Sequence, residues 1–328
     1  MYKCMRKRRS RQNTNTKSFD LKMGGKNTKT FKIQDDSKNT HKKIPLHTVE
    51  GIPIPTSFFT PEKLQSAISY KATPEDVFIV TYPKCGTTWM QYIVWEIINE
   101  GAPLPSFDDM NVKYVPFLEL TGREIAETMK PPKLFKVHLP YHLTPHHPEA
   151  KYIFVARNPF DCCVSFYNHT KKIKNCYHFE DGTFDDFFEC FIRGEVHYGD
   201  FFDHLLSWWP HRQDPNVLFT TYEEMKSNPE NAVTNVAKFL GNDYWEKLKD
   251  DKDLVDKILE NTDFNNMKEK LQYNIGQDGD NDQKVEFFRK GQVGEWKENF
   301  SDEQYRRLKK HMMQKTEGTD IPKLWKDL

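Results

Sequence analysis

Four short runs of apolar and β-branched residues stand out in the middle of the chain. They are Val77–Tyr82, Leu134–His138, Tyr152–Arg157 and Val217–Thr221. Each run is nearly continuous in such residues instead of alternating with polar ones, which is typical of strands that are buried on both faces of a parallel sheet. The pattern therefore predicts four strands of one central parallel sheet.

Segments with helical patterns separate these strands. The predicted helices are Trp89–Asn99, Phe184–Ile192, Phe201–Trp209 and Asn231–Leu240. The last of them follows Pro229, a residue that favours the first turn of a helix. Because strands that alternate with helices form layered α/β domains, we predict an α/β domain that begins near Ile44.

The first 43 residues have a different composition. They contain fourteen Lys and Arg residues against three Asp, a net charge of +11, and very few large apolar side chains. Such a segment buries too little apolar surface to offset its ordering entropy, so we expect residues 1–43 to be a disordered basic tail and residues 44–328 to be the folded domain. Within the tail, Lys7–Arg11 fits either a solvated run of charge or a nuclear or polyanion address.

Charge and cysteine content narrow the class of protein. The 328 residues hold 48 Lys and Arg and 48 Asp and Glu, so the folded part carries −11 and lacks the basic field that nucleic-acid binding requires. No apolar run approaches the roughly 20 residues that span a bilayer, and none follows the basic N-terminus as a secretory signal would. The six cysteines form no C-x-x-C pair, which favours reduced thiols and a cytoplasmic protein. Taken together, the charge and the apolar runs predict neither a nucleic-acid nor a membrane partner.

The segment after the first predicted strand is a candidate anion site. It consists of Lys84, Cys85, Gly86, Thr87 and Thr88, and a helix follows it. The first amides of a helix lack partners and lie at the positive end of its dipole, Gly86 lets an oxyanion approach the backbone, and the threonines add hydroxyl donors. A cation such as Lys84 is otherwise unfavourable there, which favours anion binding over a simple helix cap. The order of Lys and Gly differs from the GxxxxGK[ST] loop, so we do not expect ATP or GTP hydrolysis.

A second cationic turn lies near the C-terminus. Arg289 and Lys290 are adjacent, and Gly291 and Gly294 follow them. Backbone amides around Gly291 are able to form an anion nest beside the two cations. Taken alone, the pattern fits either a second phosphate clamp or a charged surface loop.

The two turns together give a resemblance to a known family. Thr81–Trp89 (TYPKCGTTW) resembles the 5′-phosphosulfate loop of the cytosolic sulfotransferases, and Arg289–Lys297 (RKGQVGEWK) resembles their 3′-phosphate loop. Further stretches that fit the family's pattern, in its order, are Lys136–Pro140, Ala156–Ser165, Gly194–Gly199, Trp208–Trp209 and Thr221–Met225. The resemblance covers nearly everything from about residue 44 onward. It implies a single α/β domain of three layers, with a central parallel sheet and a P-loop-like phosphate loop.

The resemblance implies an enzyme that moves a sulfuryl group from 3′-phosphoadenosine 5′-phosphosulfate (PAPS) to a hydroxyl or amine of a small molecule. The product nucleotide is adenosine 3′,5′-bisphosphate (PAP). No metal is required, because fixed cations neutralise the donor. The residues that the resemblance assigns to the nucleotide are Lys84, Cys85, Gly86, Thr87, Thr88, Trp89, Arg157, Ser165, Tyr222, Thr262, Phe264, Met267, Arg289, Lys290 and Gly291.

His138 is the predicted general base. Its ordinary pKa of about 6.5 suits proton abstraction near neutrality, and it stands two residues after Lys136, so both side chains point to the same side of the strand. Lys136 and Lys84 would stabilise charge on the sulfuryl and bridging oxygens. The family suggests that Ser165 holds Lys84 away until an acceptor binds.

A zinc site is the alternative for the histidines near this strand. His138, His142, His146 and His147 crowd one stretch. No cysteine pair accompanies them, and three prolines prevent a regular helix that would align them. We therefore expect no metal.

Two positions depart from the family's pattern. Cys85 stands where a Ser is common, and a thiol at a helix N-terminus is either a redox-sensitive group with a lowered pKa or a neutral isostere of Ser. The family's dimer motif, KxxxTVxxxE, aligns with Lys297–Arg306, where Ser301–Asp302 replaces Thr-Val and Arg306 replaces Glu. The reciprocal charge pairing is lost, so we expect a monomer or a weak dimer.

Aromatic residues are the candidate walls of the acceptor site, although each of them fits the core equally well. They are Phe58, Phe59, Tyr114, Phe117, Phe166, Tyr167 and His169. An aromatic pocket favours phenols or aromatic amines over long sugars. The competing functions are a nucleotide kinase, which needs an Asp for Mg²⁺ that we do not find, a non-catalytic nucleotide-binding protein, and a Golgi-type enzyme acting on glycans, which needs a membrane anchor.

Overall fold

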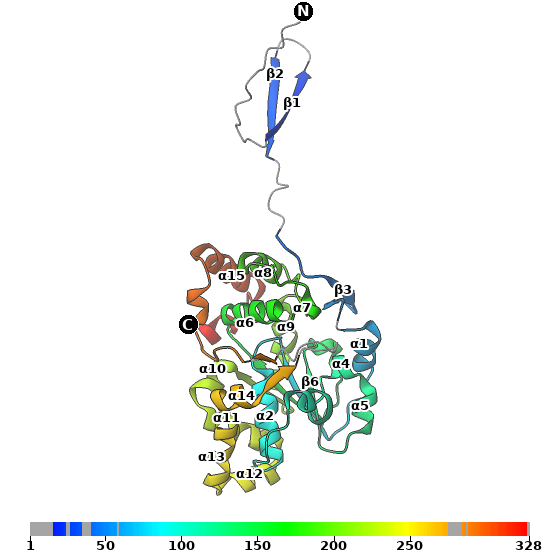
Figure 1. Ribbon diagram of the computed structural model, residues 1–328, viewed down its shortest axis with the longest axis vertical. Coiled ribbons are helices and arrows are strands. Elements are labelled where there is room, and N and C mark those ends of the chain that lie inside the picture. Colours follow the sequence, from blue (N-terminus) through cyan, green and yellow to red (C-terminus); the bar gives the residue numbers. More distant parts are fainter. Residues whose placement is uncertain are drawn as a thin grey trace, which may run out of the picture. The chain divides into compact units, whose positions relative to one another are not determined.

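The computed structural model describes residues 16–23, 27–34, 41–57, 59–274, 284–286 and 288–326, and the chain forms two compact units, Met1–His41 and Lys42–Leu328. In the small unit, β1 (Thr16–Met23) and β2 (Asn27–Gln34) form an antiparallel pair (Figure 1). Both segments alternate apolar with polar residues, a strand pattern that composition alone hides. Residues 1–15, including Lys7–Arg11, lie outside the described residues, so the disorder of the tail as a whole stays a prediction.

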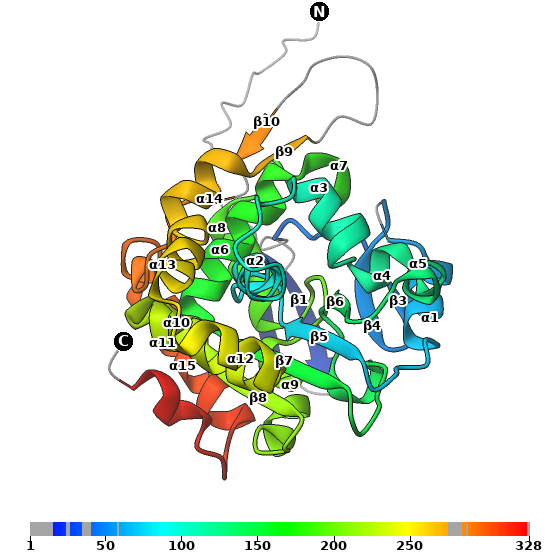
Figure 2. The same ribbon diagram turned by 90° about the horizontal axis from the view of Figure 1, so that it is seen from below.

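The large unit is built on a parallel sheet of four strands. In spatial order they are β6 (Lys133–Val137), β5 (Asp76–Thr81), β7 (Lys151–Ala156) and β8 (Val217–Thr221) (Figure 2). Every neighbouring pair is parallel. All four strands predicted from the sequence are confirmed, each shifted by no more than one residue. The prediction of burial on both faces is wrong for the middle of β8, which is only half-buried.

Helices cover both faces of the sheet. The side chains of β5 therefore point alternately into two apolar cores, one on each face. Phe78 and Val80 belong to a core shared with α6 (Pro159–Lys172), α8 (Phe184–Ile192), α9 (Phe201–Trp208) and α15 (Asp302–Lys315). Val77 and Ile79 belong to the other, shared with α2 (Thr87–Ile98), α11 (Pro229–Leu240) and α13 (Lys252–Asn261). Figure 1 shows the two groups of helices on opposite sides of the unit. The three-layer architecture is thus confirmed, as are all four predicted helices.

Shorter elements complete the large unit. They are β3 (Leu46–Val49), β4 (Ile52–Pro55), α1 (Pro61–Ile68), α3 (Phe107–Asp109), the π-helical turn η2 (Met110–Tyr114), α4 (Leu118–Thr121), α5 (Arg123–Thr128), η3 (Tyr141–Leu143), α7 (Lys174–Tyr177), η4 (Trp209–His211), α10 (Tyr222–Ser227), α12 (Asn242–Lys249), α14 (Phe264–Lys270), β9 (Gln272–Asn274), β10 (Lys284–Glu286), η5 (Glu295–Glu298) and η6 (Ile321–Trp325). Within the described residues, no helix has the length and apolar character that crossing a bilayer requires.

The carboxyl ends of β5, β6 and β7 meet at one edge of the sheet. The chain leaves β5 for the turn that contains Lys84 and Gly86, while His138 directly follows β6 and Arg157 directly follows β7. Because β6 and β7 flank β5 on opposite sides, the connections that leave these strands diverge at this edge. In open parallel sheets, ligands bind in the crevice that such a divergence creates.

Candidate active site

A cavity of about 490 Å³ lies at this edge of the sheet, and its wall contains both cationic turns. The predicted residues in the wall are Lys84, Gly86, Thr87, Thr88, Trp89, Lys136, His138, Arg157, Ser165, Tyr222, Thr262, Phe264, Met267, Arg289, Lys290 and Gly291. Of the residues predicted for catalysis or for the nucleotide, only Cys85 is absent from this wall. The fold thus brings segments from distant parts of the sequence to one place.

The turn between β5 and α2 has the backbone of an anion loop. Lys84 and Gly86 both adopt left-handed conformations, with φ of 70° and 101°. This conformation is costly for a residue other than glycine and is found preferentially at functional sites. A Cβ on Gly86 would lie 2.9 Å from the ring of Tyr222, so glycine is needed here for space as well as for conformation. Helix α2 begins at Thr87, and the residues of its first turn, whose amides lack partners within the helix, line the cavity.

Cys85 turns away from the cavity into the apolar core. Its side chain is fully buried, and its Sγ lies 3.8 Å from that of Cys162. Burial, followed by the hydrogen bond and charge of Cys162, raises the pKa of the Cys85 thiol well above its usual value. The hypothesis of a lowered pKa is therefore wrong, because desolvation outweighs the helix dipole. A neutral isostere of Ser fits this environment.

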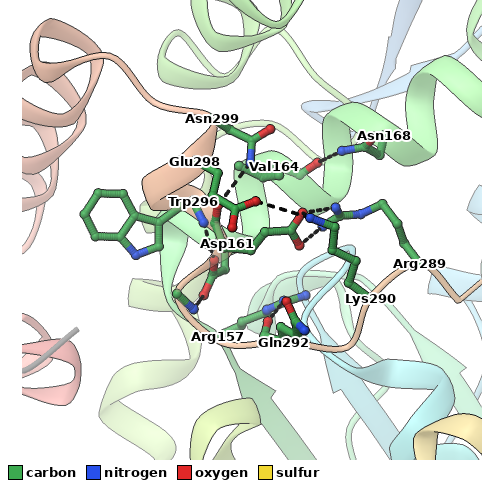
Figure 3. A network of polar contacts seen from close by, with 12 residues as sticks. Arg157, Asp161, Val164, Asn168, Arg289, Lys290, Gln292, Trp296, Glu298 and Asn299 are labelled. Carbon is green, nitrogen blue, oxygen red and sulfur yellow. Dashed lines mark hydrogen bonds and ion pairs between the residues drawn. The ribbon is translucent and has the colours of Figure 1, made fainter.

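The second cationic turn is held by an acidic residue of its own segment. Arg289 makes a two-pronged ion pair with Glu295, and Nζ of Lys290 lies 3.1 Å from the same carboxylate and 3.3 Å from Glu298 (Figure 3). Burial tends to raise the pKa of Glu295, but the hydrogen bonds from Arg289 and Lys290 lower it overall. The two cations are thus fixed side by side at the wall of the cavity.

Helix α6 anchors this turn to the domain. Asp161, in the first turn of α6, accepts hydrogen bonds from the backbone N–H groups of Gly294 (2.7 Å) and Trp296 (2.9 Å) (Figure 3). Charge-assisted hydrogen bonds to backbone amides are about twice as strong as neutral ones. The turn that carries Arg289 and Lys290 is therefore fastened next to Arg157, which precedes the same helix.

Arg157 joins the two turns. Its Nη1 donates to the carbonyl oxygen of Lys84 (3.0 Å), its Nη2 donates to that of Gln292 (3.4 Å), and its guanidinium lies 4.3 Å from the ring centre of Tyr222. Its Nε is buried without a hydrogen-bond partner in the described part of the chain. An unsatisfied buried donor costs about 1–3 kcal/mol, a penalty that a bound anion would remove. The residues present therefore fit a phosphorylated ligand.

His138 is held as a neutral base. Its Nδ1 lies 2.8 Å from the backbone oxygen of Thr81, which can only accept, so Nδ1 carries the proton and Nε2 has a free lone pair. Burial, and then the charge of Lys136, lowers the pKa of His138 well below its usual value. The imidazole is therefore uncharged at neutral pH and able to take a proton at Nε2.

Sequence reasoning missed the carboxylate behind this histidine. Glu119 is fully buried, and its Oε1 accepts hydrogen bonds from the backbone N–H of His138 (2.5 Å) and from the hydroxyl of Tyr198 (3.3 Å). Burial raises the pKa of Glu119 to about 7. Nothing in the local pattern marks Glu119 as a partner of His138, because the contact joins the residue that follows β6 to α4, which lies earlier in the chain.

The two lysines of the site have polar partners that the sequence did not reveal. Nζ of Lys84 lies 3.3 Å from Nδ1 of His169, and Nζ of Lys136 donates to Oδ1 of Asn111 (3.3 Å). Burial, followed by the charges of Lys136 and Arg157, lowers the pKa of Lys84 to about 7, and burial lowers that of Lys136 to about 8. Ser165 lines the same cavity, and its predicted hold on Lys84 stays a prediction.

The predicted acceptor walls divide into two groups. Phe59, Phe117 and His169 line the cavity, whereas Tyr114, Phe166 and Tyr167 do not. The prediction is wrong for these three because they pack in the apolar cores, Tyr114 against Trp95 and Tyr167 against Phe184, while Phe166 is fully buried. Phe58 lies outside the described residues. Wall residues that the sequence did not single out include Asn111, Ile173, Tyr177 and His197.

Known proteins match both the sequence and the fold. A family model described as "Sulfotransferase domain" matches residues 74–320. "Sulfotransferase 1 family member D1" of Mus musculus is 36% identical over 288 residues, which cover 84% of this chain and 94% of that protein, and "Sulfotransferase 1C2" of Homo sapiens is 34% identical over 293 residues (85% and 95%). The crystal structure of mouse sulfotransferase SULT7A1 complexed with PAP is similar, with a TM-score of 0.68 and 28% identity over 86% of this chain and 98% of that one.

Proposed function

The chain belongs to the sulfotransferase family, and on that premise we propose that its acceptor is a small aromatic molecule, a phenol or an aromatic amine. The enzyme uses PAPS as the sulfuryl donor and releases PAP. The observation that carries the acceptor proposal is the aromatic wall around His138, which Phe117 contacts edge-on with ring centroids 5.1 Å apart. Phe59 extends this wall, 5.5 Å from Phe117. Such surfaces select flat aromatic ligands.

We assign the nucleotide to the two cationic turns. Lys84 and the first amides of α2 would hold the 5′-phosphosulfate, while Arg157, Arg289 and Lys290 would hold the 3′-phosphate. Ser165 and Gly291 belong to the second group. The support for this assignment is the position of all these residues in one cavity wall and the unpaired Nε of Arg157.

The catalytic step follows from the state of His138. Nε2 of His138 takes the proton from the acceptor hydroxyl, the acceptor oxygen forms a bond to sulfur, and the bond between sulfur and the 5′-phosphate oxygen breaks. The electron pair of that bond leaves with PAP. Lys84 and Lys136 stabilise the charge that develops on the sulfuryl and leaving oxygens. Glu119 orients the backbone at His138 without touching the reacting atoms.

We further propose a cytoplasmic enzyme that acts as a monomer or a weak dimer. The five described cysteines are free, as in a reducing compartment. In the segment that aligns with the family's dimer motif, Arg306 pairs with Glu303 of the same helix (2.7 Å).

The acceptor proposal is tested with the purified full-length chain. Calorimetric titration with PAP first establishes nucleotide binding, and labelled PAPS then reports sulfuryl transfer to a panel of simple phenols, aromatic amines, aliphatic alcohols and monosaccharides. We expect kcat/KM to be highest for the phenols or the aromatic amines. Higher kcat/KM for aliphatic alcohols or sugars would refute the aromatic acceptor, while the PAP titration would separately confirm an intact donor site.

A further inference from the structure

His197 places an unsatisfied polar atom in the wall of the acceptor cavity. Its side chain is only 3% exposed, and Nε2 is buried with no hydrogen-bond partner among the residues that the structure describes. Nδ1 of the same ring lies 3.3 Å from the hydroxyl of Tyr177. Because native proteins rarely leave a buried polar atom unpaired, Nε2 of His197 is an atom that a ligand would satisfy.

The position of His197 relates it directly to the reacting centre. Five aromatic rings form a closed circle in the order His138, Phe117, Phe59, His197 and Tyr198. The distances between the centroids of neighbouring rings, taken in that order and back to His138, are 5.1, 5.5, 4.5, 4.1 and 5.3 Å. His138 and His197 thus line the same cavity, and only the ring of Tyr198 lies between them in the shorter direction around the circle. An acceptor whose reacting hydroxyl meets His138 has its remaining atoms within reach of His197.

The surroundings of His197 determine which group it binds. Among the described residues, the rings in contact with His197 belong to Phe59, Tyr177 and Tyr198, and such an aromatic environment does not favour an anion or an ammonium group. Burial, and then the charge of Lys136, lowers the pKa of His197 well below its usual value, so the ring is neutral. A neutral imidazole donates from one nitrogen and accepts at the other, and a hydroxyl group satisfies either tautomer because it both donates and accepts.

We propose that His197 forms a second polar subsite in the acceptor cavity, and that the acceptor carries a second, uncharged hydroxyl group that binds at Nε2. This inference rests on the proposed function, because it places the reacting hydroxyl at His138. It defines the acceptor as a molecule with two hydroxyl groups on an apolar frame, of which one is sulfated and the other is bound. His197 is then a specificity-determining residue and takes no part in proton transfer.

Matched pairs of acceptors test the subsite. One series pairs 4-alkylphenols with 4-(ω-hydroxyalkyl)phenols of one to four side-chain carbons, and a second series pairs primary alkanols with α,ω-diols of equal length. The measured quantity is the ratio of kcat/KM within each pair. For the wild-type enzyme we expect the second hydroxyl to raise kcat/KM about 10-fold or more at one or more lengths, since leaving a buried polar group unpaired costs factors of this order.

Three variants assign the effect to His197. His197→Phe keeps a ring but removes Nε2, so the ratio should fall to about 1 or below. His197→Gln restores a side-chain group that hydrogen-bonds and should recover part of the ratio. His142→Phe, at an exposed position outside the cavity wall, makes the same exchange elsewhere and should leave the ratio unchanged. Titration with PAP verifies that each variant is folded.

Two results would overturn the subsite. One is a wild-type ratio near 1 at every length in both series, and the other is an unchanged ratio in the folded His197→Phe enzyme. If the enzyme sulfated only the alkanols and diols, the proposal of an aromatic acceptor would be refuted. The proposal for His197 would still be tested, by the ratio of kcat/KM between diols and alkanols.

Discussion

The lowered pKa of Lys84 predicts that the enzyme takes up protons when it binds PAP. Burial and the neighbouring charges of Lys136 and Arg157 bring this pKa to about 7 in the free enzyme. At pH 8, about nine in ten molecules therefore hold Lys84 uncharged. Phosphate oxygens placed beside the ammonium favour its charged form and return its pKa toward the usual value. Binding of PAP at pH 8 should then take up about 0.9 proton at Lys84.

Calorimetry measures this uptake directly. PAP is titrated at pH 8 in buffers of different ionisation enthalpy, and the slope of the observed enthalpy against the ionisation enthalpy gives the number of protons bound. Lys136, with a pKa of about 8, contributes up to about half a proton more. Lys84→Met should remove about 0.9 proton from the total, whereas Lys113→Met, outside the cavity wall, should leave it unchanged. An uptake that Lys84→Met does not alter would refute the reasoning.

Because the pKa of Lys84 is lowered, a rise in pH should weaken the binding of PAP but stabilise the fold of the free enzyme. Between pH 7 and pH 9 the free enzyme must bind a proton at Lys84 to hold PAP, so log Kd should rise by about one per pH unit from this group. The unfolded chain, in which the pKa of lysine is about 10.5, binds more protons than the folded one between pH 7 and 10.5. The contribution of Lys84 therefore destabilises the free fold fully below pH 7, and the penalty fades as the pH rises to 10.5.

Three further predictions address the base, the second turn and the assembly. His138→Ala should bind PAP nearly as well as the wild type but turn over ~10²-fold more slowly or worse, and comparable turnover would remove His138 from its role. Gly291→Ala places a Cβ 2.3 Å from the ring of Phe264 at a φ of +64°, and it should weaken PAP binding at least ~10-fold. Gly318→Ala, at a similar φ of +80° but with open space around it, is the control for backbone strain alone. In sedimentation velocity the protein should be a monomer or a weak dimer, and a stable dimer that buries Lys297–Arg306 would contradict the loss of the dimer motif.

The strands and the two cationic turns could be predicted because local rules govern them. Continuous apolar runs mark strands covered on both faces, and the observed strands β5, β6 and β7 follow those runs to within one residue. A turn with a positive φ favours glycine, and Gly86 and Gly291 adopt φ of 101° and 64° in the two cationic turns. Parallel strands end at a common edge of the sheet, so strand ends that are dozens of residues apart in the sequence must lie close together in the fold.

Contacts between distant segments could not be predicted in this way. Sequence pattern shows that Phe166 is apolar and helical, but not that its ring lies in the core while Phe117 lines the cavity. The environment of Cys85 was misjudged for the same reason, because the helix N-terminus is visible in the sequence whereas its burial against Cys162 is not. Burial changed the sign of the expected pKa shift.

The three histidines of the cavity wall show which site residues a sequence pattern can identify. All three imidazoles are uncharged for the same reason, since burial lowers the pKa of each. His138 was predicted because it follows a strand that lies between the two cationic turns in the sequence. His169, which was expected in the acceptor wall, lines the cavity and contacts Lys84. His197 lies in Gly194–Gly199, a stretch that fits the family's pattern without giving this histidine a role, and only its unpaired Nε2 reveals one. A sequence pattern thus identifies histidines that serve a chemistry common to many proteins. An unsatisfied polar atom in the cavity wall instead identifies the part of the site that would distinguish one acceptor from another.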